Sequence, residues 1–136
     1  MMGSVADGAR AGGAHTLGII PQSLVDLEVA DTGADELIVT ADMGSRKELM
    51  IDHSDAFIVL PGGLGTLDEL FEVWTTATLD IHRKPIVVLD PDDFYDGLFA
   101  WLGKLADTEF VRRRALEQVT VVSSVAAAFD ALGEAE

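Results

Sequence analysis

The sequence has no cysteine, few basic residues and no long run of apolar residues. Without cysteine, the chain has no disulfide, no thiolate metal site and no cysteine nucleophile. Only 9 lysines and arginines stand against 24 aspartates and glutamates, which gives a formal charge of −15. That charge repels nucleic-acid backbones and anionic lipids, so neither is an expected partner. No apolar run approaches the roughly 20 residues that span a bilayer, and we expect a cytoplasmic protein.

Length and composition favour one folded domain. The chain has 136 residues, of which 49% are hydrophobic and 24% are charged. These values are ordinary for a globular protein, and a chain of this size supports one core. We therefore expect residues 1–136 to form a single domain. An acidic chain can still bind a small phosphate if backbone N–H groups and a few cations focus positive potential at one place.

Short apolar runs alternate with segments of helical period, a pattern typical of βαβ units and a parallel sheet. The predicted strands are residues 16–20, 36–40, 56–60, 85–89 and 119–122. The predicted helices are residues 2–11, 46–53, 65–79, 93–105, 109–116 and 124–132. Because AFIVL and PIVVL are apolar throughout, their strands are expected to be covered by helices on both faces. The pattern predicts a Rossmann-like α/β fold.

The predicted helix over residues 65–79 has an apolar stripe with i, i+3, i+4 spacing. The spacing predicts that this stripe packs on the sheet as core, and that its aromatic residues form no cofactor site. The stripe consists of Leu67, Leu70, Phe71, Trp74, Ala77 and Thr78.

A glycine-rich loop, PGGLGT at residues 61–66, follows a predicted buried strand and opens the next helix. It therefore lies at the carboxyl edge of a parallel sheet, where ligands bind in doubly wound folds. Gly62, Gly63 and Gly65 let the backbone approach an anion, which the first N–H groups of the helix and the Thr66 hydroxyl can bind. The alternative is a tight strand-to-helix turn without a ligand. The loop matches neither the P-loop nor the GxGxxG pattern.

Glu69 lies three residues after Thr66, so the two share one helix face beside any bound phosphate. A carboxylate next to a ribose phosphate can stabilise an oxocarbenium-like centre or activate water. Thr-x-x-Glu is also the pattern of a capping box, in which Glu69 only satisfies the N–H groups of its own helix. The spacing alone leaves both interpretations open.

Arg46 and Lys47 follow Ser45 after the apolar run ELIVT, and Ser45 with Glu48 forms a second possible capping box. Two cations at a helix N-terminus oppose the helix dipole, which suggests that an anion compensates them. The alternative is that both side chains project into solvent or pair with carboxylates. The histidines have no metal-ligand spacing, so no metal site is predicted.

Three segments together resemble the LONELY GUY (LOG) family of cytokinin riboside 5′-monophosphate phosphoribohydrolases. They are MGSRKELM at residues 43–50, SDAFIVLPGGLGTLDEL at residues 54–70 and IHRKPIVVLD at residues 81–90. The family pairs an M-x-x-R-K segment with P-G-G-x-G-T-x-x-E, and both patterns stand in the same order in this chain.

The resemblance implies hydrolysis of the N-glycosidic bond of a cytokinin riboside 5′-monophosphate or AMP, a small-molecule nucleoside monophosphate, without a cofactor. It implies that Arg46 and Glu69 are the catalytic pair and that the protein is a homodimer. The implied phosphate- and nucleotide-binding residues are Gly62, Gly63, Gly65, Thr66, Lys47 and Met43. The alternatives are a nucleotide-binding module without catalysis and an inactive remnant.

Members of the family usually have roughly 50 to 70 further residues before the position that matches Met1, within the usual range of domain sizes. Those residues carry two strands and a nucleotide-binding loop. We therefore expect a Rossmann-like parallel sheet that lacks the first two strands of the family.

Overall fold

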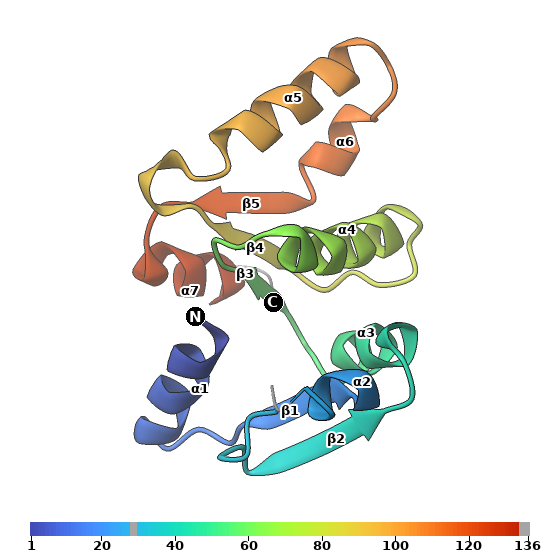
Figure 1. The fold of residues 1–136 in the computed structure, drawn as a ribbon. Helices are drawn as coiled ribbons and strands as arrows, with labels where there is room; N and C mark the ends of the chain where they lie inside the picture. The colour runs from blue at the N-terminus through green and yellow to red at the C-terminus, as the bar shows by residue number, and fades with distance from the viewer. Residues whose placement is uncertain (28–29, 134–136) are drawn as a thin grey trace. The chain divides into compact units, whose positions relative to one another are not determined.

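A computed structural model describes residues 1–27 and 30–133 of the chain (Figure 1). It divides at residue 53 into two compact units, one formed by residues 1–53 and one that begins at Ser54. Each unit has its own parallel sheet. That residues 1–136 form one domain stays a prediction.

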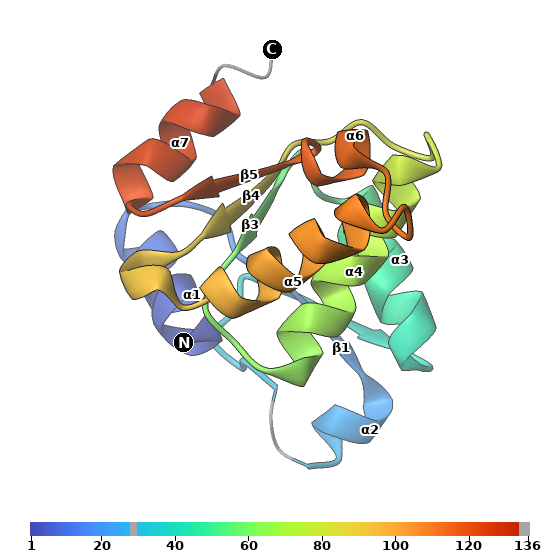
Figure 2. The same ribbon diagram turned by 90° about the horizontal axis from the view of Figure 1, so that it is seen from above.

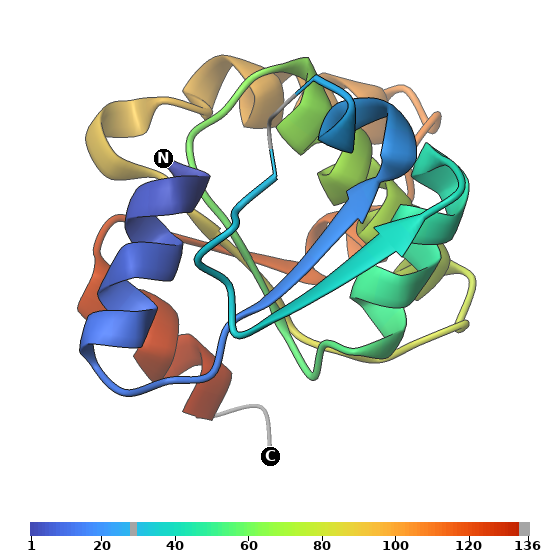
Figure 3. The same cartoon turned by 60° about the horizontal axis from the view of Figure 1, so that its bottom comes forward.

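The first unit has two parallel strands, β1 (Leu17–Pro21) and β2 (Glu36–Thr40), aligned so that Ile19 lies opposite Ile38. Its helices are α1 (Met2–Ala11), α2 (Gln22–Val25) and α3 (Met43–Asp52), and α3 packs against both strands (Figure 3). The single turn of α2 was not predicted from the sequence. The bounds of β2 and α1 match the prediction.

Arg10 links the end of α1 to the loops that flank the strands of this unit. Its guanidinium donates to Asp31 Oδ2 at 2.9 Å and to Thr16 Oγ1 at 3.3 Å. Asp35 accepts hydrogen bonds from the backbone N–H and the hydroxyl of Thr16, both at 2.7 Å. The hydrogen bond from Arg10 holds the pKa of Asp31 below its ordinary value, and the bonds from Thr16 do the same for Asp35.

The second unit has three parallel strands in the order β3 (Phe57–Val59), β4 (Ile86–Leu89), β5 (Val119–Val122). In β4, Ile86, Val87 and Val88 are at most 2% exposed, so this central strand is covered on both faces as predicted. In β3, Ile58 is 38% exposed, because β3 is an edge strand of this sheet. The expectation of two covered faces was wrong for β3.

Helices cover the two faces of this sheet, with α7 (Val125–Gly133) on one side and α4 (Leu64–Thr78) and α5 (Asp96–Asp107) on the other (Figure 2). A short helix, α6 (Arg113–Leu116), precedes β5. The parallel sheets flanked by helices form the predicted Rossmann-like α/β fold.

The buried stripe of α4 is rotated from the predicted one. Phe71 was expected in the core but is 37% exposed, whereas Val73 is buried. The buried residues follow i, i+3, i+4, i+7 spacing, which is the face that a straight helix turns to a sheet. They are Leu70, Val73, Trp74 and Ala77.

Two predicted helices begin later than expected because residues with positive φ precede them. Asp92 and Asp93, with φ of 59° and 58°, follow Pro91 in a 3-10 turn (Pro91–Asp93), so α5 begins at Asp96 and not at residue 93. Glu109 has φ of 64°, so residue 109 cannot begin the helix that the structure starts at Arg113. Left-handed residues do not fit a right-handed helix.

Candidate phosphate-binding site

The glycine loop connects β3 to α4 at the carboxyl end of β3. Gly63 is the N-cap of α4, and Leu64 is its first residue. Within residues 1–27 and 30–133, the N-cap of α4 makes no side-chain capping hydrogen bond. The first N–H groups of an α-helix have no partner within the helix and attract anions. The start of α4 thus provides backbone donors that no capping side chain occupies.

The three glycines have different structural roles. A Cβ at Gly62 would lie 2.1 Å from Thr66 Oγ1 and 2.8 Å from Thr66 Cβ, so the close approach of Thr66 requires glycine at this position. A Cβ at Gly63 or at Gly65 would meet nothing within 4 Å. These two glycines face open space, in contrast to Gly62.

Glu69 is the sixth residue of α4 and is half-buried. The capping-box interpretation was wrong, because Gly63 is the N-cap and Thr66 is already the third residue of the helix. Thr66 and Glu69 remain three residues apart on one face of α4, as expected. Asp68 is exposed beside them.

Helix α3 follows β2 in the same way but begins with a capping side chain. Asp42 is its N-cap, and Asp42 Oδ1 accepts a hydrogen bond from the Ser45 N–H at 2.8 Å. Ser45 was expected to be the cap and is instead the donor, so the predicted start at residue 46 was wrong by three residues. The hydrogen bonds from Ser45 lower the pKa of Asp42 from its ordinary value.

Arg46 lies in the first turn of α3, at its fourth residue, and is half-buried. Its Nε donates to the carbonyl oxygen of Ile19 in β1 at 3.0 Å. Arg46 therefore does not simply project into solvent, and whether it also pairs with a carboxylate stays open. Lys47 follows it and is also half-buried, and Met43, the first residue of α3, is exposed.

The predicted site residues therefore form two sets. The first unit carries one set on the first five residues of α3, and the second unit carries the other on the glycine loop and the start of α4. The first set consists of Met43, Arg46 and Lys47, and the second of Gly62, Gly63, Gly65, Thr66 and Glu69.

Sequence reasoning missed Tyr95, which contacts the glycine loop directly. The Tyr95 hydroxyl donates to the Leu60 carbonyl at 2.7 Å and accepts from the Gly62 N–H at 3.1 Å. Burial raises the pKa of Tyr95, although the bond from Gly62 acts in the opposite direction and Asp90 adds to the increase. No sequence signal connects residues so far apart, and position 95 lay inside a predicted helix.

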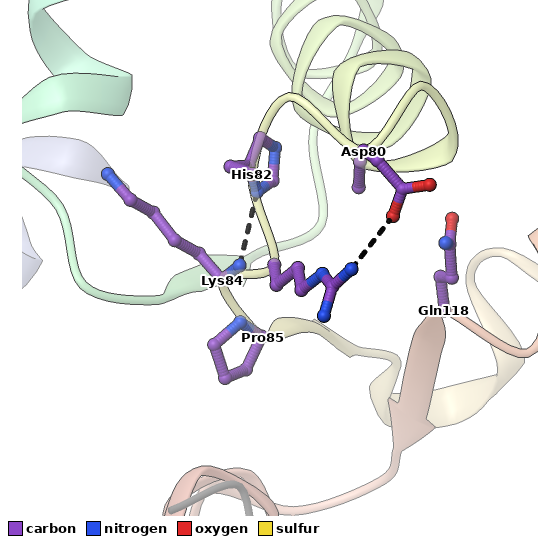
Figure 4. Close-up of a pocket in the computed structure, with 7 residues that line it drawn as sticks. Asp80, His82, Lys84, Pro85 and Gln118 are labelled. Atoms are coloured by element: carbon purple, nitrogen blue, oxygen red, sulfur yellow. Dashed lines mark hydrogen bonds and ion pairs between the residues drawn. The ribbon is translucent and has the colours of Figure 1, made fainter.

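A hollow of about 300 Å³ lies at the opposite edge of the same sheet, near the amino-terminal ends of β4 and β5 (Figure 4). Its lining includes Asp80, Arg83 and Gln118, and Asp80 pairs with Arg83 at 3.7 Å. His82 accepts from the Lys84 N–H at 3.2 Å through Nδ1, so Nε2 carries the proton and donates to the Val73 carbonyl at 2.8 Å. This hollow is distinct from the glycine loop.

The part of the chain that the structure describes contains neither a metal-binding cluster nor a membrane-spanning helix. No group of three or more His, Cys, Asp or Glu side chains in residues 1–27 and 30–133 is placed to hold a metal ion. Over the same residues, no helix combines the length and the apolarity needed to cross a membrane.

Comparison with known proteins identifies the family. Residues 2–132 match the family described as "Possible lysine decarboxylase". The chain belongs to this family, the LOG family that the sequence motifs resemble.

Several relatives have the same enzyme name. A protein from Mycobacterium tuberculosis named cytokinin riboside 5′-monophosphate phosphoribohydrolase is 57% identical over 91% of this chain and 66% of its own length. A protein of that name from Mycobacterium marinum is 55% identical over the same shares, and one from Arabidopsis thaliana is 45% identical over 82% of the chain and 49% of its own length. The chain thus spans from about half to just under two thirds of the length of these relatives.

Proposed function

We propose that the protein hydrolyses the N-glycosidic bond of a purine riboside 5′-monophosphate, AMP or a cytokinin riboside 5′-monophosphate, and releases the free base and ribose 5-phosphate. The proposal rests most on the 57% identity, over 91% of the chain, to a relative with that enzyme name. The uncapped start of α4 gives the phosphate of such a substrate a place to bind.

In this proposal the 5′-phosphate binds at the first turn of α4. The backbone N–H groups of that turn and the Thr66 hydroxyl are the donors, and the open space at Gly63 and Gly65 admits the phosphate oxygens. The positive end of the helix dipole adds to the attraction. These groups bind one small anion although the chain as a whole carries a charge of −15.

Glu69 and Arg46 are the proposed catalytic residues. Cleavage of the bond between ribose C1′ and the base develops positive charge on the sugar, which the Glu69 carboxylate stabilises while water adds to C1′. The Arg46 guanidinium is a fixed cation that can hold the substrate phosphate or the departing base in place. Lys47 and Met43 are proposed to contact the nucleotide from the same helix.

The test is chromatographic analysis of AMP and of a prenylated AMP after incubation with the protein. We expect free base and ribose 5-phosphate in equal amounts, and no base from adenosine, which lacks the phosphate. Absence of base release from every purine monophosphate tested would refute the proposal. A parallel incubation with L-lysine tests the name of the family, and we expect no carbon dioxide from it.

A second candidate is a nucleotide-binding module without catalysis, which the glycine loop alone supports. The two candidates differ in one result: binding of AMP by calorimetry without release of adenine over many hours favours the module. We also propose a cytoplasmic homodimer, as the family resemblance implies. Sedimentation equilibrium at twice the chain mass of 14.5 kDa would support the dimer.

A further inference from the structure

We propose that Tyr95 is a positioning residue that holds the glycine loop in its phosphate-binding conformation. Tyr95 is the only tyrosine in the sequence and is 4% exposed. Its hydroxyl bonds to the Leu60 carbonyl and to the Gly62 N–H, the two backbone groups on either side of Pro61. The inference rests on the proposed function, since it assigns a role in the same phosphate site.

The chemistry of the loop explains why a hydroxyl is needed. Pro61 has no N–H, so the polar backbone groups beside it are an acceptor at Leu60 and a donor at Gly62. A phenol hydroxyl donates one hydrogen bond and accepts others, so a single group satisfies both. Loss of the hydroxyl leaves two part-buried backbone groups without this partner, which weakens the preferred loop conformation.

Tyr95 is itself fixed to the sheet. Its backbone N–H donates to Asp90 Oδ1 at 2.9 Å, and the Asp90 N–H donates to the Val122 carbonyl at 2.7 Å. Asp90 is 7% exposed. The phenol ring also makes an edge contact with Phe94, with ring centroids 4.8 Å apart. A chain of contacts thus connects β5 through Asp90 and Tyr95 to the loop that opens α4.

This connection changes the expected role of Gly62. Its N–H is bonded to Tyr95, so Gly62 supports the loop and the phosphate donors are the N–H groups further along, in the first turn of α4. Binding of an anion by backbone N–H groups is strong when the donors are already in place before the ligand arrives. Tyr95 supplies that preorganisation without touching the substrate, which makes it a positioning residue.

The first experiment compares the Y95F variant with the wild-type chain and with T76V. Thr76 Oγ1 bonds to the Glu72 carbonyl at 2.7 Å and to the Val73 carbonyl at 3.1 Å, so T76V also removes a part-buried hydroxyl but lies far along α4 from the loop. Calorimetry with ribose 5-phosphate is expected to give roughly tenfold weaker binding for Y95F and unchanged binding for T76V, with similar melting temperatures. With AMP as substrate, the KM of Y95F should rise by a similar factor, and its kcat should change by less than threefold in either direction.

Three results would overturn the inference. They are equal affinity of Y95F and wild type for ribose 5-phosphate, equal loss in Y95F and T76V, and no ribose 5-phosphate binding by the wild-type chain. The proposed hydrolysis is judged separately by base release from AMP. A loss of affinity in Y95F without any base release refutes the proposed hydrolysis and supports the role of Tyr95. Base release together with equal affinities supports the proposed hydrolysis and refutes the role of Tyr95.

A second measurement does not depend on the folding of Y95F. Because the chain has one tyrosine, biosynthetic 3-fluorotyrosine labels position 95 alone. We expect the fluorine resonance to shift on addition of ribose 5-phosphate and to stay in place on addition of ribose. An unchanged chemical shift at a saturating concentration of ribose 5-phosphate would contradict the inference.

Discussion

Helices α3 and α4 both follow a parallel strand, but only α4 begins without a capping side chain. The carboxylate of Asp42 already accepts an N–H of α3 and places a negative charge at its N-terminus. Gly63 brings neither a carboxylate nor a hydroxyl to the start of α4. A helix N-terminus is available to an anionic ligand only where no capping side chain already occupies it. The N-terminus of α3 is therefore occupied by a side chain of its own N-cap, whereas that of α4 presents backbone N–H donors.

The largest expected effect concerns Glu69. If its charge supports the transition state, E69Q should lower kcat on AMP by roughly a hundredfold or more, in line with losses of comparable groups. The melting temperature should barely change, because glutamine fits the same space on α4. Kinetics and thermal melting of the same preparation measure both quantities.

The matched control is D68N, at an exposed position next to Glu69 on the same helix. It removes the same charge from the chain without touching the proposed site, so its turnover should equal that of wild type. Equal turnover in E69Q and wild type would remove Glu69 from the catalytic pair.

Arg46 is expected to show the next largest effect. R46K keeps the positive charge but loses the planar guanidinium and its Nε bond to Ile19. Turnover should fall roughly tenfold to a hundredfold, and the first unit should lose about 1 kcal/mol of stability from the missing hydrogen bond. Denaturant titration measures the stability, with R83K as a control at an exposed arginine. Unchanged turnover in R46K would indicate that only charge is needed at this position.

The fold was predictable from the sequence wherever the apolar pattern of a segment determines its secondary structure. Strands β2 and β5 have the predicted bounds, and every predicted strand exists. The predicted helix bounds were wrong where single residues determine the backbone conformation. Asp42 moved the start of α3, and left-handed Asp93 and Glu109 delayed two later helices.

The site was predictable only in part, for a related reason. The glycine loop and Glu69 lie within nine consecutive residues, so their spacing on a helix follows from the sequence. The contact between Tyr95 and Gly62 joins residues 33 positions apart and depends on the turn at Asp92 and Asp93. Such contacts depend on tertiary packing, which spacing along one chain does not encode.

Substitution of Gly62 is expected to have a smaller effect, and it tests the packing of the loop and not the space for the ligand. In G62A the new methyl group would meet Thr66 Cβ at 2.8 Å, so the loop or the start of α4 must move. Crowding of this kind costs about 1–3 kcal/mol. Chemical denaturation should show the loss in G62A and none in G103A, where the added methyl group meets nothing within 4 Å. Full stability in G62A would contradict the close packing of Thr66.

The smallest effects are expected from pH, and they differ between the two units. The pKa values of Asp31 and Asp35 lie below the ordinary value of 3.8, so these carboxylates stabilise the first unit at pH above 3.8. This stability is lost as the pH falls through their pKa values in the folded protein. The pKa of Tyr95 is raised, so its effect on stability has the opposite pH dependence. Its contribution to the stability of the second unit is fully present at pH below 10.0 and is lost as the pH rises above that value.

Melting curves across pH test this contrast. D31N with D35N should flatten the acid side of the stability profile, and Y95F should flatten the alkaline side. An acid side unchanged by the double substitution would show that other carboxylates control the first unit.

Binding of the substrate phosphate at the uncapped first turn of α4 is tested by one pair of variants. Gly65 and Gly97 are the second residues of α4 and α5, and a Cβ at either meets nothing within 4 Å. Alanine at either position should keep or slightly raise stability, because alanine favours helices by up to about 1 kcal/mol over glycine. Calorimetry with ribose 5-phosphate should then give at least roughly tenfold weaker binding for G65A, where the methyl group enters the space of the phosphate, and wild-type binding for G97A. Equal affinity of G65A, G97A and wild type would contradict the claim.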